Sequence, residues 1–158
     1  MAHDPSAVGA DAQPAGTGTT RDQILAMFER RQKAFDDLDA AVLADDYAEN
    51  CVVESPMGGV HQGRAAAQTV IRAWFDAFVD LKTRVECLLI DGQRVAQAMA
   101  IEGTHIGTFL GVAPTGRHFK FNGVFIFDLQ NGEIVHERRI YDFTGLLVQI
   151  GVLKTKLG

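Results

Sequence analysis

Apolar residues recur at helical spacing in three segments of the first half of the chain. The first segment begins at Thr20, where TRDQ matches a Ser/Thr-x-x-Gln capping box and apolar positions then follow a helical period. A shorter helix is predicted from Asp39, as its N-cap, to Tyr47. The third covers residues 64–79, and CVVES at 51–55 is predicted to be a strand. The broad apolar face of the third helix consists of Val70, Ile71, Trp74, Phe75 and Phe78.

The second half alternates in polarity with a period of two, which is typical of strands. Two segments, residues 82–105 and 118–143, are each divided by an Asp-Gly or Asn-Gly dipeptide, so each is predicted to form a β-hairpin. A last short helix is predicted over GLLVQIGVL, capped by Thr144. These elements predict an α+β fold, in which a curved antiparallel sheet wraps around the N-terminal helices and leaves a cone-shaped cavity.

Six ionisable residues lie together in HERRIYD, at 136–142, and strand alternation divides them between two faces. One face carries Glu137, Arg139 and Tyr141, and the other carries His136, Arg138, Ile140 and Asp142. The preceding strand has an aromatic face that should contact the helices, made of Phe119, Phe121, Phe125, Phe127 and Leu129. A two-residue turn would pair Phe125 with Arg138, whereas a three-residue turn with a bulge at Gly132 would pair it with Arg139. The second register, slightly favoured, brings Glu137 and Arg139 into the cavity.

Composition and charge limit the expected partners and location of the protein but do not indicate a function. Residues 1–19 are rich in Ala, Gly, Pro, Asp and Thr without periodicity, so we expect a disordered leader before a single domain at 20–158. The net charge of −5 gives no reason to expect nucleic acid or an anionic membrane as a partner. No apolar run is long enough to span a bilayer, and we expect a cytoplasmic protein. Cys51 and Cys87 are expected to be buried free thiols.

Two segments, GTHIGTFLGVAPTGRHFKF (103–121) and NGEIVHERRIYDFTGLLVQIGVL (131–153), contain the patterns G-x-x-x-G-x-x-P-T-G and D-F-x-G-x-L-x-Q-x-G. Through them the chain resembles the SnoaL-like polyketide cyclase, or ester cyclase, family from about Asp22 to Gly151. The resemblance implies the cone-shaped α+β fold of the nuclear-transport-factor-like superfamily, shared with limonene-epoxide hydrolases and ketosteroid isomerases. It also implies acid–base chemistry in the cavity without a cofactor.

The family's acid–base pair is absent from this sequence. The position of the cyclases' catalytic Asp is Arg139 here, and the position of their assisting His is Phe125. The water-holding Asn of the epoxide hydrolases corresponds to Glu54. The resemblance therefore suggests a redistributed pair, with a carboxylate at Glu54 and a guanidinium at Arg139.

The predicted catalytic residues are Glu54, His105, Glu137 and Arg139. A carboxylate in an apolar cavity beside an Arg can serve as a base, and the Arg can hold an enolate or phenolate oxygen. His105 would carry a proton if it faces the cavity, and otherwise would be a surface hydrogen-bonding residue. Alternatively, Glu and Arg form a buried pair whose hydrogen bonds are made only between the two residues, without a role in chemistry. The predicted substrate-binding residues are Tyr47, Trp74, Glu102, Asn122, Phe125 and Tyr141, with Glu102 inward only if Gly103 marks a bulge.

No nucleotide loop, zinc-ligand spacing or Ser-His-Asp order is evident, so no cofactor and no metal are expected. The sequence thus predicts a cofactor-independent lyase, isomerase or cyclase that performs proton-transfer or aldol chemistry on a hydrophobic, aromatic or polycyclic molecule. The alternatives are a non-catalytic binding module of the same fold and an epoxide-hydrolase-like hydrolase. A homodimer or higher oligomer is expected through an apolar patch on the outer sheet face, formed by Val124, Ile126, Ile134 and Ile140.

Overall fold

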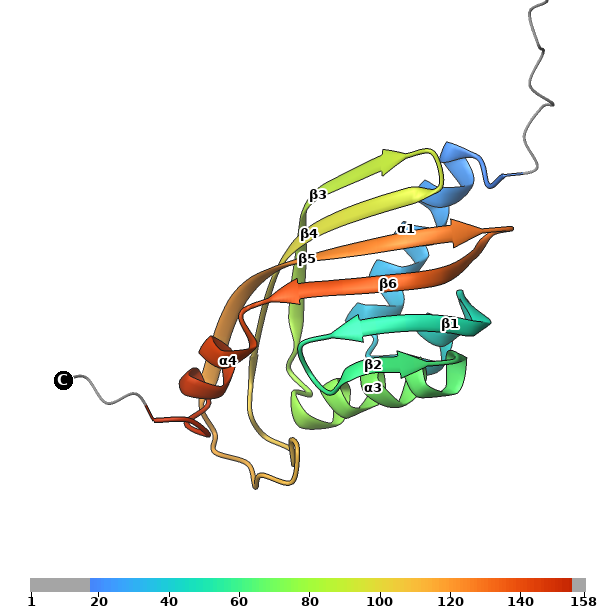
Figure 1. Cartoon of the computed structure of the whole chain (residues 1–158). Helices are drawn as coiled ribbons and strands as arrows, with labels where there is room; N and C mark the ends of the chain where they lie inside the picture. The colour runs from blue at the N-terminus through green and yellow to red at the C-terminus, as the bar shows by residue number, and fades with distance from the viewer. Residues whose placement is uncertain (1–17, 155–158) are drawn as a thin grey trace, which may run out of the picture.

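Three helices cover the inner face of a curved six-stranded sheet in the computed structural model, which describes residues 18–154 (Figure 1). The helices are α1 (Arg21–Asp36), α2 (Ala40–Asp45), α3 (Arg64–Ala77) and α4 (Phe143–Gln149). The strands are β1 (Tyr47–Ser55), β2 (Gly59–Gln62), β3 (Lys82–Asp91), β4 (Arg94–Thr104), β5 (His118–Gln130) and β6 (Glu133–Tyr141). The strand order is β2-β1-β6-β5-β4-β3, and the sheet stays open. The predicted α+β fold is confirmed, whereas all but the last two residues of the predicted leader lie outside the described residues.

Local sequence explains where the first two helices begin. The side chain of Thr20 accepts a hydrogen bond from the backbone N–H of Gln23, whose side chain accepts one from the backbone of Thr20. This is the predicted capping box. Asp39 caps α2 by accepting from the backbone N–H groups of Ala41 and Val42. Both caps satisfy donors that the first turn of a helix leaves without a partner.

Both α2 and α3 end earlier than predicted. α2 ends at Asp45 rather than Tyr47, because Tyr47 already belongs to β1. α3 ends at Ala77, because the backbone of Phe78 leaves the helical region, with φ −136° and ψ 68°. The chain can therefore turn from α3 directly into the β-hairpin that follows.

The last helix, α4, both begins and ends earlier than predicted: its N-cap is Asp142 rather than Thr144, and it ends at Gln149 rather than Leu153. Oδ1 of Asp142 accepts a hydrogen bond from the backbone N–H of Gly145 at 2.7 Å. Gln149 in the last turn bonds to both backbone groups of Lys120 on β5, at 2.9 and 3.1 Å. These bonds hold α4 against the sheet at the C-terminal end of the chain (Figure 1).

A β-bulge sets the register of the β5–β6 hairpin. The turn itself is the two-residue Asn-Gly loop, but Val135 is an extra residue in β6: Ile134 lies opposite Leu129, and the pairing then resumes one residue out of step. Phe125 consequently lies opposite Arg139. The predicted pairing is therefore confirmed, although the extra residue lies in the strand rather than in the turn.

The other end of the sheet departs from the antiparallel prediction. β1 pairs with β6 in parallel, and the remaining neighbouring strands are antiparallel. β2 was not predicted, because GVHQ is short and its side chains show no alternation of burial. β1 also starts at Tyr47, four residues before the predicted strand, which places Tyr47 beside β6.

The outer face of the sheet carries part of the predicted apolar patch. Val124 and Ile140 are exposed there, but Ile134 is fully buried because the bulge turns it inward. Arg138 lies beside them with 61% of its side chain exposed. The predicted homodimer or higher oligomer remains a prediction, with Ile134 removed from its interface.

Two expectations from composition can be compared with the structure. Cys51 is buried as expected, whereas Cys87 is exposed on β3, and neither forms a disulfide. None of the helices within residues 18–154 combines the length and the apolar character needed to cross a bilayer.

Candidate active site

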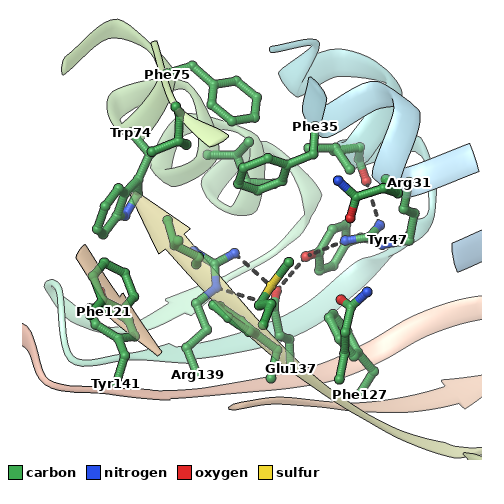
Figure 2. A pocket seen from close by; sticks show the side chains of 18 residues that line it. Arg31, Phe35, Tyr47, Trp74, Phe75, Phe121, Phe127, Glu137, Arg139 and Tyr141 are labelled. Carbon is green, nitrogen blue, oxygen red and sulfur yellow. Dashed lines mark hydrogen bonds and ion pairs between the residues drawn. The ribbon is translucent and has the colours of Figure 1, made fainter. Parts of the chain in front are cut away.

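A mainly apolar cavity lies between the inner face of the sheet and the helices (Figure 2). Its outline takes in about 750 Å³ that no atom occupies, part of which is open solvent at its mouth. The apolar lining comprises Phe35, Leu43, Ile71, Trp74, Phe75, Leu81, Met99, Ile101, Phe121, Phe125 and Phe127. The polar lining comprises Arg31, Gln32, Tyr47, Gln97, Glu137, Arg139 and Tyr141.

Trp74 forms the aromatic wall on the α3 side. Its ring centroid lies 5.9 Å from that of Tyr141, 6.1 Å from that of Phe121 and 5.5 Å from that of Phe109. Tyr141 stacks on Phe121 with 5.0 Å between ring centroids. These rings present flat apolar surfaces to a ligand, which suits an aromatic molecule.

Glu137 and Arg139 project into the cavity from β6, two residues apart on one face of the strand. Arg139 donates from Nε to Oε1 of Glu137 at 2.8 Å and from Nη2 to Oε2 at 3.1 Å. The hydroxyl of Tyr47 donates to the same Oε2. Glu137 is only 2% exposed, and the Arg139 side chain only 8%. Because a carboxylate accepts about four hydrogen bonds, Glu137 keeps room for roughly one more.

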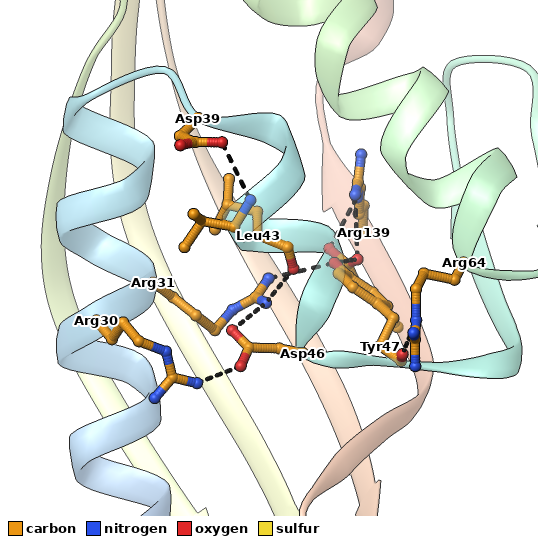
Figure 3. Close-up of polar contacts among 10 residues, drawn as sticks. Arg30, Arg31, Asp39, Leu43, Asp46, Tyr47, Arg64 and Arg139 are labelled. Carbon is orange, nitrogen blue, oxygen red and sulfur yellow. Dashed lines mark hydrogen bonds and ion pairs between the residues drawn. The ribbon is translucent and has the colours of Figure 1, made fainter.

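Arg31 from α1 reaches the same group from the other side (Figure 3). Its Nη2 donates to the hydroxyl of Tyr47 at 3.2 Å, and its Nη1 donates to Oδ2 of Asp46 at 3.2 Å. Arg31, Tyr47, Glu137 and Arg139 thus form one hydrogen-bonded group, the buried polar network, which joins α1, β1 and β6. Figure 2 shows it along one side of the cavity.

The network has a defined charge state at neutral pH. Burial raises the pKa of Glu137, but the charge of Arg139 and the hydrogen bonds from Arg139 and Tyr47 outweigh it, so the pKa lies below that of an ordinary Glu. Burial lowers the pKa of Arg139, and the charge and hydrogen bonds of Glu137 raise it further than burial lowers it. Burial and the charge of Glu137 raise the pKa of Tyr47 to about 12. The cavity therefore holds an ionised carboxylate, a charged guanidinium and a protonated phenol.

Glu54 lies on the outer face of the sheet, so the predicted Glu54–Arg139 pair is wrong. Its neighbour Val53 is fully buried, and strand alternation points Glu54 the other way, with 43% of its side chain exposed. Its carboxylate lies 2.9 Å from Nε2 of His136 and 3.7 Å from Nε of Arg138. Proton transfer in the cavity cannot involve this carboxylate.

Glu102 and Asn122 also face away from the cavity, contrary to prediction. The β4–β5 pairing continues without a shift through Gly103, so the bulge that would have turned Glu102 inward is absent from this pair of strands. Glu102 is partly exposed, 3.9 Å from His118. Asn122 is exposed on β5, on the face opposite the phenylalanines.

His105 lies neither in the cavity lining nor on the surface. It is fully buried, and its ring centroid lies 5.8 Å from that of Phe78 and 6.3 Å from that of Phe109. Nδ1 of His105 contacts Thr115 twice: it lies 3.0 Å from Oγ1 and accepts from the backbone N–H at 3.3 Å. Among residues 18–154, Nε2 has no hydrogen-bond partner. His105 is therefore not positioned to exchange a proton with a ligand in the cavity.

The remaining predicted site residues line the cavity: Tyr47, Trp74, Phe125, Glu137, Arg139 and Tyr141. Arg31 and Gln97 line it too and were not predicted. Arg31 follows Phe28 by three residues, which places it on the apolar face of α1. Gln97 shares its strand face with the buried Val95 and Met99. Both positions could have been recognised as polar residues within an apolar pattern.

The arrangement supports proton transfer beside a developing oxyanion. Within residues 18–154, Nη1 of Arg139 makes no hydrogen bond and is not fully buried, and Arg139 lines the cavity. It can therefore donate to a ligand oxygen while Nε and Nη2 hold Glu137. An ionised carboxylate and an available guanidinium N–H next to each other suit the removal of a proton from carbon beside a carbonyl group.

The chain is similar to known proteins in sequence and in fold. Residues 26–150 match the model of the family described as SnoaL-like polyketide cyclase. Nogalonic acid methyl ester cyclase of Streptomyces nogalater is 32% identical over 119 residues, covering 73% of this chain and 84% of that protein. Aklanonic acid methyl ester cyclase AcmA of Streptomyces galilaeus is 30% identical over 81 residues, covering 50% and 56%. The structure of TsrD from Streptomyces laurentii has a TM-score of 0.74 at 24% identity, covering 85% of this chain and 99% of TsrD, which supports the fold alone.

Proposed function

Because the chain belongs to the SnoaL-like polyketide cyclase family, we propose that it closes a carbon ring in an aromatic polyketide ester by an intramolecular aldol reaction. Two relatives named as methyl ester cyclases support this substrate class. The observation that carries the proposal is the buried carboxylate of Glu137, which lines an apolar cavity beside the available N–H of Arg139.

In this proposal Glu137 is the base and Arg139 binds the oxyanion. Glu137 removes a proton from a carbon flanked by two carbonyl groups, and the resulting enolate oxygen accepts a hydrogen bond from Nη1 of Arg139. The lowered pKa makes Glu137 a weak base. Its reaction therefore depends on a substrate carbon that is already acidic and on Arg139 stabilising the enolate as it forms.

The ring closes in the next step. The enolate carbon attacks a ketone carbon of the same molecule, a carbon–carbon bond forms, and the ketone oxygen becomes an alkoxide. The proton on Glu137 then passes to that alkoxide. The carboxylate is regenerated and the product is an isomer of the substrate, so the reaction consumes neither a second substrate nor an electron carrier.

Tyr47 and Arg31 act as positioning residues. The hydroxyl of Tyr47 donates to Glu137, and Arg31 donates to that hydroxyl from the other side. With its pKa raised to about 12, Tyr47 keeps its proton and stays a donor to the carboxylate. Together they fix the orientation of Glu137 when the enolate forms.

A non-catalytic binding module is the second candidate, and one observation favours it. Glu137 already accepts three hydrogen bonds, from Tyr47 and Arg139. A buried pair of this kind can satisfy itself without taking part in chemistry. In that case aromatic ligands would occupy the cavity and leave it unchanged.

The test is conversion of nogalonic acid methyl ester and aklanonic acid methyl ester by the purified protein, followed by liquid chromatography and mass spectrometry. We expect a product of unchanged mass and altered retention from at least one of them. Glu137→Gln and Arg139→Met should each lower turnover by about 10²–10³-fold, the usual effect of losing one preorganised group. Arg138→Met is the matched control, because it removes the adjacent guanidinium from the outer face of β6.

The outcomes separate the two candidates. Equal loss in Arg138→Met and Arg139→Met would contradict the assignment of Arg139. Tight binding of both esters by the wild type and by Glu137→Gln, without conversion by either protein, would overturn the cyclase and support the binding module.

A further inference from the structure

We propose that Gln97 is a second anchor for the ligand, which selects the end of the ring system that reaches Glu137. The inference rests on the proposed function only in taking the ligand to be a planar ring compound with oxygen substituents. It assigns a specificity-determining role to a residue outside the buried polar network.

Gln97 is a buried polar residue whose side chain has no hydrogen-bond partner in the described part of the chain. It is 8% exposed and lines the cavity from β4. Within residues 18–154, its carboxamide makes no hydrogen bond, yet neither amide atom is fully buried. Gln32 gives the contrast: it lines the same cavity, but its amide donates to Asp36 and Thr83 at 2.9 and 2.8 Å. Buried carboxamides are normally satisfied, so an unpartnered one that opens on a cavity indicates a ligand contact.

The sheet register places Gln97 at a fixed separation from the proposed reaction centre. Gln97 lies opposite Phe125 on β5, and Phe125 lies opposite Arg139 on β6. The three side chains therefore form one row across adjacent strands, all on the inner face. With about 4.8 Å between neighbouring strands, the backbones of Gln97 and Arg139 are about 10 Å apart. The ring of Phe125 lies between them as an apolar floor.

This row matches a flat molecule with an oxygen at each end. A carboxamide carries both a donor and an acceptor, so it can pair with either a carbonyl or a hydroxyl oxygen. An oxygen at one end would contact Arg139 while an oxygen at the far end meets Gln97. A ligand with only one oxygen would leave Gln97 facing carbon, which is unfavourable for the amide. Two anchors thus distinguish the two ends of a substrate, which a single anchor cannot do.

The experiment measures binding by isothermal titration calorimetry with 2-naphthol and 2,6-dihydroxynaphthalene, which differ by one hydroxyl at the far end of the ring system. The wild type should bind the diol about 5- to 20-fold more tightly, of which twofold reflects the symmetry of the diol and the rest one hydrogen bond. In Gln97→Met, which keeps the side-chain length and removes the amide, the preference for the diol should fall to about the twofold that its symmetry gives. Binding of 2-naphthol should stay within about twofold of the wild type.

Gln62→Met provides the matched control, because it makes the same chemical change at an exposed position on β2. It should retain the preference for the diol. The inference is overturned if the wild type shows no preference beyond twofold, if neither ligand binds, or if Gln97→Met weakens both ligands equally. Thermal melting shows that each variant is folded. Failure of the aldol proposal is seen separately, as ester binding without conversion in a wild type that still prefers the diol.

Discussion

Arg30 and Arg31 are consecutive residues that bind the same carboxylate, Asp46, in different surroundings. The Arg30 side chain is 54% exposed, whereas that of Arg31 is 10% exposed and also donates to Tyr47. An ion pair at the surface contributes little to stability, because water screens both charges. Removing one partner of a buried pair is costly, because the other charge stays buried. Substituting each arginine in turn therefore separates the effect of an exposed ion pair from that of a buried one at the same carboxylate.

We expect Arg31→Met to lower the free energy of unfolding by about 3 kcal/mol, because Asp46 and the hydroxyl of Tyr47 lose their buried donor. Arg30→Met should lower it by less than about 1 kcal/mol. Urea unfolding of both variants checks the difference. Similar losses in the two variants would show that Arg31 contributes no more than a surface pair.

The site residues that the sequence identified are those for which strand alternation and register agree. Glu137 and Arg139 follow from the parity of β6 once Phe125 is paired correctly. The family position of Glu54 predicts an inward side chain, but the alternation of CVVES makes Val53 the inward residue. His105 failed because strand parity does not describe a residue that lies just after the last residue of β4.

At the scale of elements, both long hairpins were predicted from their Asp-Gly and Asn-Gly dipeptides. Asn131-Gly132 forms the β5–β6 turn, whereas the β3–β4 turn is Gly92-Gln93, because Asp91 still pairs with Arg94. The parallel pairing of β1 with β6 joins residues about 80 positions apart along the chain, and local patterns carry no information on such contacts. The position of the bulge at Val135 likewise cannot be predicted from the sequence, because no Gly or Pro marks it.

The segment between β4 and β5 closes the end of α3 by a close backbone contact. The backbone N–H groups of Ile106 and Gly107 both donate to the carbonyl of Ala77, at 3.1 and 2.9 Å. A Cβ added at Gly107 would lie 1.9 Å from the carbonyl oxygen of Asp76. Only glycine therefore allows this segment to lie against the helix end.

We expect Gly107→Ala to lower the free energy of unfolding by about 3 kcal/mol or more, as overpacking against backbone cannot relax easily. Gly111→Ala is the control: its φ of +77° strains any side chain, but nothing lies within 4 Å of the added Cβ. Gly111→Ala should lower the free energy of unfolding by about 1–2 kcal/mol. Thermal unfolding, with fluorescence of the single tryptophan Trp74, checks both variants. Equal stability of Gly107→Ala and Gly111→Ala would contradict this packing.

At the scale of the whole molecule, the buried polar network makes folding stability depend on pH in two ranges. Tyr47 binds its proton more tightly when folded, because its pKa is raised from 10.0 to about 12. Its contribution is therefore complete below pH 10 and is lost as the pH rises toward 12. Glu137 has a lowered pKa. Its contribution is complete above the ordinary Glu value of about 4.3 and is lost as the pH falls through the folded value.

We expect Tyr47→Phe to show this dependence in the alkaline range. The stability difference between the wild type and the variant should shrink by roughly 2–3 kcal/mol between pH 10 and 12, since one pKa unit corresponds to about 1.4 kcal/mol. Urea unfolding at closely spaced pH values measures the difference. If the stability of the wild type and that of Tyr47→Phe changed in parallel with pH, Tyr47 would have the same pKa in the folded and unfolded chains. Tyr141→Phe serves as the control and should leave most of the alkaline loss in place.

The extra residue at Val135 has a consequence for comparing this chain with its relatives. Ile134 on one side of the bulge and Glu137 on the other both face inward, although regular alternation would oppose them. A homologue without the bulge would be one residue shorter here and still place the same side chains in its cavity. A gapless alignment across the turn would then equate its inward residue with Arg138 instead of Arg139. Alignments of this hairpin should therefore allow a one-residue gap at position 135 before any catalytic residue is transferred.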